Sequence, residues 1–247
     1  EKLVVAIGED EAGELYPILA RAHENDVPEL QLVTAAKARA LEPTLSDKVS
    51  AALYSPVSGI FDSHGYFLAL QGEIEDRGGM IAFGSPVMGG AVVGDGVEVR
   101  TGGTSPTKIT ARTLINAAGH NAVAIAASIE GPHTDNLPTM HYVKGSYFSI
   151  TGKTPFSRLI YPLPGRASLG LHLSIDLAGR GKLGPDAEWL PDDAGPPFNY
   201  RVDPSRAAKF YAAARRYWPD LPDGALAPDY AGVRPKVVGP GEPSGDF

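Results

Sequence analysis

The histidine at position 172 interrupts an apolar run and is a candidate proton acceptor. In a strand over 169–175, alternate side chains share a face, which groups four aliphatic residues on one side: Leu169, Leu171, Leu173 and Ile175. His172 falls on the other side, with Gly170, Ser174 and Asp176. An imidazole titrates near neutral pH and suits general-base chemistry. The alternative is an ordinary strand histidine, half exposed, that pairs with Asp176 or with water.

The segment 230–236, YAGVRPK, is a second candidate because it places Arg234 and Lys236 on a backbone restricted by a proline. The two parallel donors of an arginine match the two oxygens of a carboxylate, so this segment indicates a carboxylate clamp. The alternative is a surface loop with ordinary charges. Lys144, close to Tyr147, gives a weaker signal of the same kind, which a snorkelling lysine on an edge strand also explains. His64 either begins a helix or points into a pocket.

Several classes of chemistry are excluded or disfavoured by composition. The 247 residues contain no cysteine, which excludes disulfides, thiolate metal sites and cysteine nucleophiles. We find no metal-ligand spacing, no phosphate-binding P-loop and no serine-hydrolase elbow. With 22 basic and 29 acidic residues, the net charge of −7 argues against nucleic acids and anionic membranes as partners. No apolar run approaches the roughly 20 residues of a membrane span.

Elements that position these residues are predicted from hydrophobic periodicity and turn signals. In the first half we expect a strand over 2–7, helices over 9–25 and 34–41, and a helix after Asp62 or Ser63, either of which can cap it. Phe67, Leu70 and Ile74 are expected to form the buried stripe of that last helix, which Gly78 and Gly79 end. Further β-rich segments are expected over 80–87 and 91–100, with a tight turn at 94–96, and over 108–116, followed by a helix over 121–129.

In the second half, antiparallel strands are expected over 142–174 and a loop over 182–197. The clearest helix is 203–218, capped by Asp203, with four basic residues on a solvated face: Arg206, Lys209, Arg215 and Arg216. Stretches that alternate strand and helix lie between stretches of antiparallel strands. The sequence therefore predicts an α/β (α+β) protein of two interleaved lobes.

Seven short motifs follow one another along the chain: SPVSGIFD at 55–62, LINAAG at 114–119, KGSYF at 144–148, LIYP at 159–162, LGLHL at 169–173, GPD at 184–186 and YAGVRP at 230–235. Together and in this order, they resemble motifs of the FAD-dependent oxidoreductases of the D-amino-acid oxidase (DAO) superfamily. Within that superfamily they are most similar to the L-2-hydroxyglutarate dehydrogenase/oxidase group. The resemblance implies an interrupted, Rossmann-type FAD-binding lobe interleaved with a substrate lobe built on a mixed or antiparallel sheet. It assigns 1–61 and 131–232 mainly to the substrate lobe, and 62–130 and 233–247 to an incomplete FAD-binding lobe.

The same resemblance implies roles for individual residues and FAD as the cofactor. His172 would accept the hydroxyl proton of a 2-hydroxy acid while hydride passes to the flavin, and Arg234 would grip the substrate carboxylate. Five further residues are expected to line the substrate pocket: His64, Lys144, Tyr147, Tyr161 and Lys236. Four residues are expected to contact the cofactor: Val87, Ala117, Ala118 and Gly119. The expected partner is a small anionic substrate, a 2-hydroxy acid or an amino acid.

The sequence departs from the family pattern at both ends. The N-terminal GxGxxG turn and ribose-binding acid are absent, as is the flavin-contacting segment expected after Phe247. We therefore expect a piece of a longer polypeptide that binds FAD poorly by itself. The expected location is cytoplasmic or membrane-peripheral, with any targeting signal in a preceding part.

Three other functions stay open at this point. An amine oxidase acting on glycine, sarcosine or a D-amino acid would have less need of a histidine base. A non-catalytic binding module would keep the fold without the flavin. A glycerol-phosphate dehydrogenase is a weaker alternative, because a phosphate pocket normally carries more positive charge. The sequence determines neither the electron acceptor nor the oligomeric state.

Overall fold

The computed structural model describes residues 1–131, 136–163 and 170–243 and divides the chain into two compact units. Each unit is assembled from separate stretches of the chain. The first consists of Glu1–Phe61, Lys144–Glu188 and Asn199–Val233, and the second of Asp62–Val143, Trp189–Phe198 and Arg234–Phe247. The assignment of substrate and FAD binding to particular ranges stays a prediction. No helix among the described residues combines the length and apolar character needed to cross a membrane.

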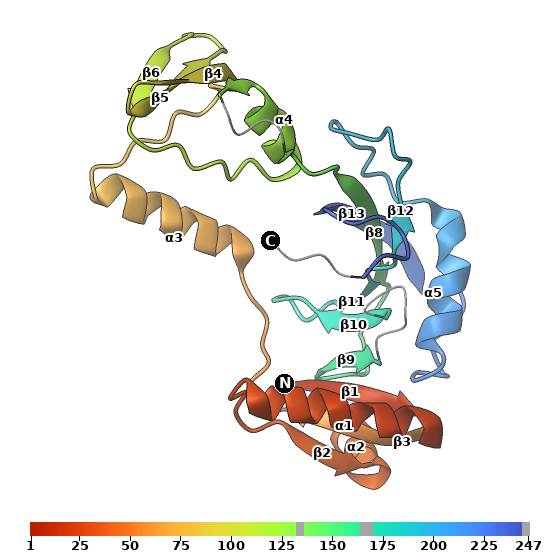
Figure 1. The fold of residues 1–247 in the computed structure, drawn as a ribbon. Coiled ribbons are helices and arrows are strands. Elements are labelled where there is room, and N and C mark those ends of the chain that lie inside the picture. The colour runs from red at the N-terminus through yellow and green to blue at the C-terminus, as the bar shows by residue number, and fades with distance from the viewer. Residues whose placement is uncertain (132–135, 164–169, 244–247) are drawn as a thin grey trace. The chain divides into compact units, whose positions relative to one another are not determined.

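The first unit is built on a mixed sheet in the order β12-β8-β11-β10-β9-β1-β3-β2, with β13 also paired to β8 (Figure 1). Its strands are β1 (Lys2–Ile7), β2 (Gln31–Thr34), β3 (Val49–Ser55), β8 (His141–Ile150), β9 (Leu159–Pro162), β10 (His172–Ile175), β11 (Gly181–Gly184), β12 (Glu188–Trp189) and β13 (Leu226–Lys236). The β1–β9 pair is parallel, whereas β10 is antiparallel to both β9 and β11. The predicted mixed α/β class is therefore confirmed.

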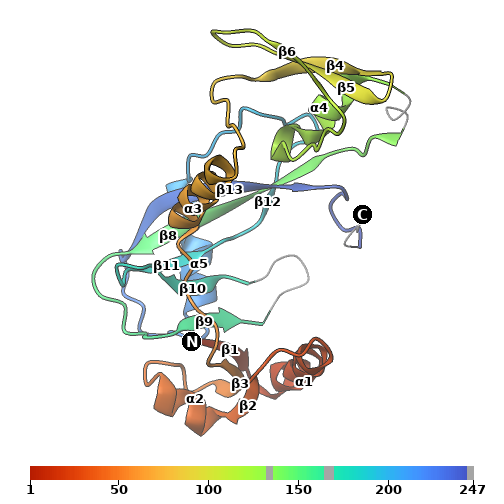
Figure 2. The same ribbon diagram turned by 90° about the vertical axis from the view of Figure 1, so that its left-hand side faces the viewer.

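Helices cover both faces of this sheet. Figure 2 shows α1 (Glu9–Glu24) and α2 (Ala35–Leu41) on the two sides of β1, β3 and β2. Leu15 of α1 packs with Ala6 and Leu53, while Ala38 of α2 belongs to the larger core. The hydroxyl of Thr34 accepts the Lys37 N–H at 3.3 Å and so caps α2. The 3₁₀ turn η3 (Pro204–Arg206) leads into α5 (Ala207–Ala214), whose Phe210 also enters the larger core.

One continuous apolar row fixes the register of the central strands. Phe148, Leu183, Leu173, Ile160 and Leu3 lie on successive strands and are each fully buried. The ring of Phe210 meets that of Phe148 at a centroid distance of 4.6 Å. Each of these side chains removes a large apolar area from water. A shift of one strand by one residue would turn its side chain of this row to the other face, and the burial of that side chain would be lost. The same register therefore also determines which side chains lie on the opposite face of these strands.

The second unit contains a four-stranded sheet in the order β6-β5-β4-β7, together with helices. Its strands are β4 (Val87–Val93), β5 (Gly96–Thr101), β6 (Lys108–Ala111) and β7 (Ile129–Glu130), and its helices are α3 (Ser63–Asp76), η1 (Gly119–Asn121) and α4 (Ala122–Ala127). The carboxylate of Asp62 accepts the Gly65 N–H at 3.0 Å, which confirms the predicted cap of α3. Gly94, with φ of +55°, makes the turn between β4 and β5.

Several predicted boundaries were wrong. The strand expected over 80–87 begins only at Val87, because the preceding segment turns at Gly84 (φ +64°) and contains Pro86. The strand expected over 108–116 ends at Ala111. The expected loop over 182–197 contains part of β11 and all of β12. The α-helix expected over 203–218 is regular only between Ala207 and Ala214.

Two predicted faces were also wrong. Phe67, Leu70 and Ile74 of α3 are 67%, 39% and 44% exposed, so they form no buried stripe among the described residues. Arg206 and Lys209 do not belong to a purely solvated face, because both bind the buried carboxylate of Asp186. The spacing of apolar residues identifies which side of a helix is apolar, but not whether another element covers that side. A basic residue gives the same sequence signal whether its side chain faces water or binds a buried acid.

Candidate functional site

Strand register brings three of the predicted site residues onto one face of the first unit's sheet. His172 pairs with Gly184 on β11, and the neighbouring pair Leu173–Ile160 places Tyr161 beside His172. A Cβ at Gly184 would lie 2.7 Å from Cδ1 of Tyr147, so the tyrosine ring leans over that glycine. The face they share is the one opposite the buried apolar row. Leu169, part of the predicted strand, lies outside the described residues.

The imidazole of His172 is held by a tyrosine ring. Its centroid lies 3.7 Å from that of Tyr161, with 8° between the ring planes. His172 is only 7% exposed, and burial raises the pKa of the Tyr161 hydroxyl above its ordinary value. From the opposite face, the hydroxyl of Tyr217 donates to the carbonyl of Leu171 at 3.2 Å, which fixes the backbone next to the histidine.

A second stacked pair continues the same face. The rings of Tyr147 and Tyr230 lie 4.5 Å apart with an interplanar angle of 16°. The ammonium of Lys182 is 4.8 Å from the Tyr230 ring and 3.3 Å from the carboxylate of Asp229. We call Tyr161, His172, Tyr147 and Tyr230 the aromatic row.

Gly184 separates the two stacked pairs of the aromatic row. The strand β11 runs between β8 and β10, and at this position it carries no side chain. Since neighbouring strands lie about 4.8 Å apart, the backbones of Tyr147 and His172 are separated by roughly 10 Å. Gly184 itself adds no side chain to this face, and the ring of Tyr147 leans over its backbone on the side of β8.

Sequence reasoning missed Gly184, Lys182 and Tyr230 as parts of this arrangement. Gly184 and Tyr230 stand in short motifs of the sequence, which was the signal that could have identified them. Lys182 gave no signal, because its partner residues lie on β13, about 47 positions later in the chain.

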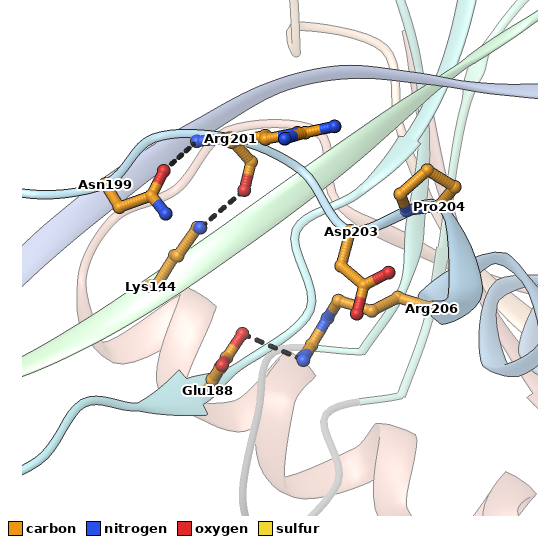
Figure 3. Close-up of a pocket in the computed structure, with 7 residues that line it drawn as sticks. All are labelled: Lys144, Glu188, Asn199, Arg201, Asp203, Pro204 and Arg206. Carbon is orange, nitrogen blue, oxygen red and sulfur yellow. Dashed lines mark hydrogen bonds and ion pairs between the residues drawn. The ribbon is translucent and has the colours of Figure 1, made fainter.

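Lys144 is not brought to the aromatic row. It precedes Tyr147 on β8 by three positions and therefore points to the other face of the sheet, where it is 9% exposed. Its ammonium donates to the carbonyl of Arg201 at 2.6 Å. It borders a cavity of about 370 Å³ in the first unit. Figure 3 shows the residues that line this cavity: Lys144, Glu188, Asn199, Arg201, Asp203, Pro204 and Arg206.

A buried carboxylate supports the strands from that same side. Asp186 accepts the Ser146 N–H at 2.7 Å and the Arg206 Nε–H at 2.8 Å, and it also pairs with Lys209. Burial by itself raises the pKa of this carboxyl, but the hydrogen bonds from Lys209, Ser146 and Arg206 together hold it below its ordinary value. The charged form thus ties η3 and α5 to β8 and to the segment after Gly184.

The other predicted site residues belong to the second unit. His64 is exposed at the second position of α3, and Arg234 is exposed on β13. The ammonium of Lys236 lies 5.6 Å from the ring of Trp189. Val87 is the half-buried first residue of β4. Their proposed roles beside His172 stay predictions.

The segment Ala117–Gly119 fits the close approach of a bulky cofactor. Its side chains are at most a methyl group, and all three residues are exposed. Gly119 has a φ of +56°, and a Cβ added there would meet nothing within 4 Å. The side chain of Asn116 holds the turn open by accepting the Ala118 N–H at 3.2 Å and donating to the carbonyl of Ala122 at 2.7 Å. An open, unobstructed backbone is what the predicted FAD contact requires.

Comparisons of this chain with a family model and with a known protein point to the same family. The model of the family described as DAO, FAD dependent oxidoreductase, matches residues 1–247. The mitochondrial L-2-hydroxyglutarate dehydrogenase of Arabidopsis thaliana is 34% identical over 281 residues, covering 100% of this chain and 58% of the relative. The chain thus spans somewhat more than half the length of this relative.

Two solved structures share the fold. The glycine oxidase from Geobacillus kaustophilus superposes with a TM-score of 0.74 at 18% identity, covering 96% of this chain and 59% of that one. The reduced L-alpha-glycerophosphate oxidase from Mycoplasma pneumoniae, solved with FAD bound, gives 0.76 at 21% identity, covering 95% and 61%. These similarities confirm the predicted fold.

Proposed function

Because this chain belongs to the DAO family of FAD-dependent oxidoreductases, we propose that the protein oxidises a small 2-hydroxy acid, with L-2-hydroxyglutarate as the expected substrate, to the 2-oxo acid. The observation that carries the proposal is the buried imidazole of His172, stacked on Tyr161 beside the bare backbone of Gly184. The 34% identity to an L-2-hydroxyglutarate dehydrogenase supports the substrate class.

In this proposal bound FAD supplies the hydride acceptor, and Val87 with Ala117–Gly119 holds the cofactor. His172 accepts the substrate hydroxyl proton on a ring nitrogen. Loss of that proton makes the adjacent C–H bond a far better hydride donor. Stacking uses the faces of the imidazole, whereas the nitrogen lone pair lies in the ring plane. Tyr161 therefore orients the base without occupying its reactive edge.

The remaining residues of the site bind and orient the substrate. Arg234 grips one carboxylate through two parallel hydrogen bonds, a role that rests on the family resemblance. Tyr147 and Tyr161 exclude water from the reacting carbon. A second carboxylate, as in 2-hydroxyglutarate, would give further cations a group to bind.

Anaerobic reduction of the flavin tests the proposal. We expect L-2-hydroxyglutarate to bleach the FAD-loaded full-length protein, and glycine, sarcosine and D-amino acids to leave it oxidised. His172→Ala should slow bleaching by about 10²–10⁴-fold, the usual contribution of a general base. The matched control is His23→Ala, an exposed histidine on α1 that should leave the rate unchanged.

Two results would contradict the proposal. Bleaching by an amino acid, with turnover kept in His172→Ala, would identify an amine oxidase instead. Full-length protein that cannot be loaded with FAD under any condition would identify a non-catalytic module with this fold.

A further inference from the structure

The cavity on the opposite side of the sheet from the aromatic row borders a buried ammonium without an ionic partner. Lys144 is more than nine-tenths buried, and its Nζ donates to one carbonyl, that of Arg201. No carboxylate in the described parts of the chain lies within ion-pair distance of this nitrogen. A buried charge normally has an opposing charge, because removal from water is costly without one. An ammonium also has three donors, of which this carbonyl uses one.

The acids around the cavity already have other partners. Glu188 binds Arg206 at 2.8 Å (Figure 3). The carboxylate of Asp203 accepts the Ser205 N–H at 2.9 Å. Arg206 is further held by Asp186. Three lining residues are cationic and two are acidic, so the lining carries one excess positive charge. Among the described lining residues, neither Lys144 nor Arg201 forms an ion pair, and of these two only Lys144 is buried.

From this combination we infer a second ligand site, for a small molecule with a single carboxylate, in the cavity lined by Lys144, Asn199 and Arg206. One excess positive charge matches one carboxylate better than a phosphate, which carries nearly two negative charges at neutral pH. The volume of about 370 Å³ lies within the range of small-molecule pockets. The carboxylate accepts from the Lys144 ammonium and completes its hydrogen bonds.

This site is separate from the proposed catalytic face. Lys144 and Tyr147 lie on opposite faces of β8, so a molecule bound at the cavity does not touch the aromatic row. Both sites are attached to the same strand, and Ser146, between these two residues, binds Asp186. The inference of a ligand site at the cavity therefore does not depend on whether His172 is the catalytic base.

The test measures binding of propionate, a monocarboxylate without a 2-hydroxyl group to oxidise. Unfolding temperature is recorded against propionate concentration in the FAD-loaded protein on an Arg234→Met background, which removes the proposed substrate clamp. We expect a saturable rise. Lys144→Met should weaken propionate binding by about tenfold or more, as for loss of a hydrogen bond to a charged group. Without propionate this variant should unfold at the same or a higher temperature, because an uncompensated buried charge is gone.

A second variant covers the case in which Lys144→Met does not fold. Asn199→Asp is isosteric, keeps the acceptor for the Arg201 N–H at 2.9 Å and adds a negative charge to the lining. It should also weaken propionate binding by about tenfold. Asn25→Asp makes the same charge change at the exposed end of α1, outside the cavity, and should bind like the parent.

Three outcomes overturn the inference. The first is the absence of any propionate-dependent rise in the parent. The second is a rise of equal size in Lys144→Met or Asn199→Asp. The third is inorganic phosphate binding at this site more tightly than propionate, which would contradict the single-carboxylate assignment.

Discussion

The imidazole of His172 lies flat against the phenol ring of Tyr161, with centroids 3.7 Å apart and planes 8° from parallel. The two residues come from neighbouring antiparallel strands, β10 and β9, and are eleven positions apart in the chain. On the proposed function, this contact determines which direction the histidine nitrogens face. The tyrosine is thus a positioning residue for the base.

Replacing Tyr161 separates the role of its ring from that of its hydroxyl. Tyr161→Leu removes the stacking surface and should lower kcat/KM by about 10–100-fold through misorientation of His172. Tyr161→Phe keeps the stack and should stay close to the parent. Because burial raises the pKa of this tyrosine, its hydroxyl remains protonated near neutral pH, and the pH profile of Tyr161→Phe should match that of the parent. Equal losses in the two variants would contradict a positioning role for the ring.

Asp186 should be a stability determinant, since it is 6% exposed and binds two cations and a backbone N–H. Asp186→Asn leaves Arg206 and Lys209 without their shared partner. Because both cations are partly exposed, we expect a loss of about 2–3 kcal/mol in the free energy of unfolding, measured by chemical denaturation. Asp223→Asn, which breaks an exposed ion pair with Arg215, is the control and should change the free energy of unfolding little. Similar stability of both variants would refute the network.

The same carboxylate gives a pH dependence with a definite sign. Its pKa is lower in the folded than in the unfolded chain, so its contribution is fully present above the unfolded pKa of about 3.9 and is lost as the pH falls through the folded value. The difference in unfolding free energy between the parent and Asp186→Asn should therefore shrink between about pH 5 and pH 3. A difference that stays constant over this range would show that the carboxyl does not titrate as described.

Gly184 should tolerate no side chain. Its φ is +139°, and a Cβ would lie 2.7 Å from Cδ1 of Tyr147 and 2.8 Å from the carbonyl oxygen of Ser146. Gly184→Ala should lower the free energy of unfolding by about 1–3 kcal/mol, and on the proposed function it should raise KM by displacing the ring of Tyr147. Gly13→Ala, in the interior of α1 with nothing within 4 Å of the added methyl, should instead stabilise by about 0.5–1 kcal/mol. Thermal and chemical denaturation of both variants measure the contrast.

Local elements were predicted well where one short-range signal determined them. The α1 and α2 helices, the Asp62 cap and the Gly94 turn each depend on residues within about one turn of one another. The strand expected over 80–87 was wrong because a proline and a glycine with positive φ outweighed its β-rich composition. The exposed stripe of α3 was wrong for another reason: periodicity shows which residues share a face, not what packs against it.

The sequence by itself determined the class of fold, the family resemblance and the alternation that sets His172 against the aliphatic face of its strand. Only the tertiary structure decided which residues are its neighbours. Tyr161 and Gly184 reach it, and Lys144 turns to the opposite face beside a cavity, because strand pairing is fixed by a buried apolar row drawn from five separate strands. Such pairing depends on the summed burial of residues far apart in the chain, and no short segment contains that information.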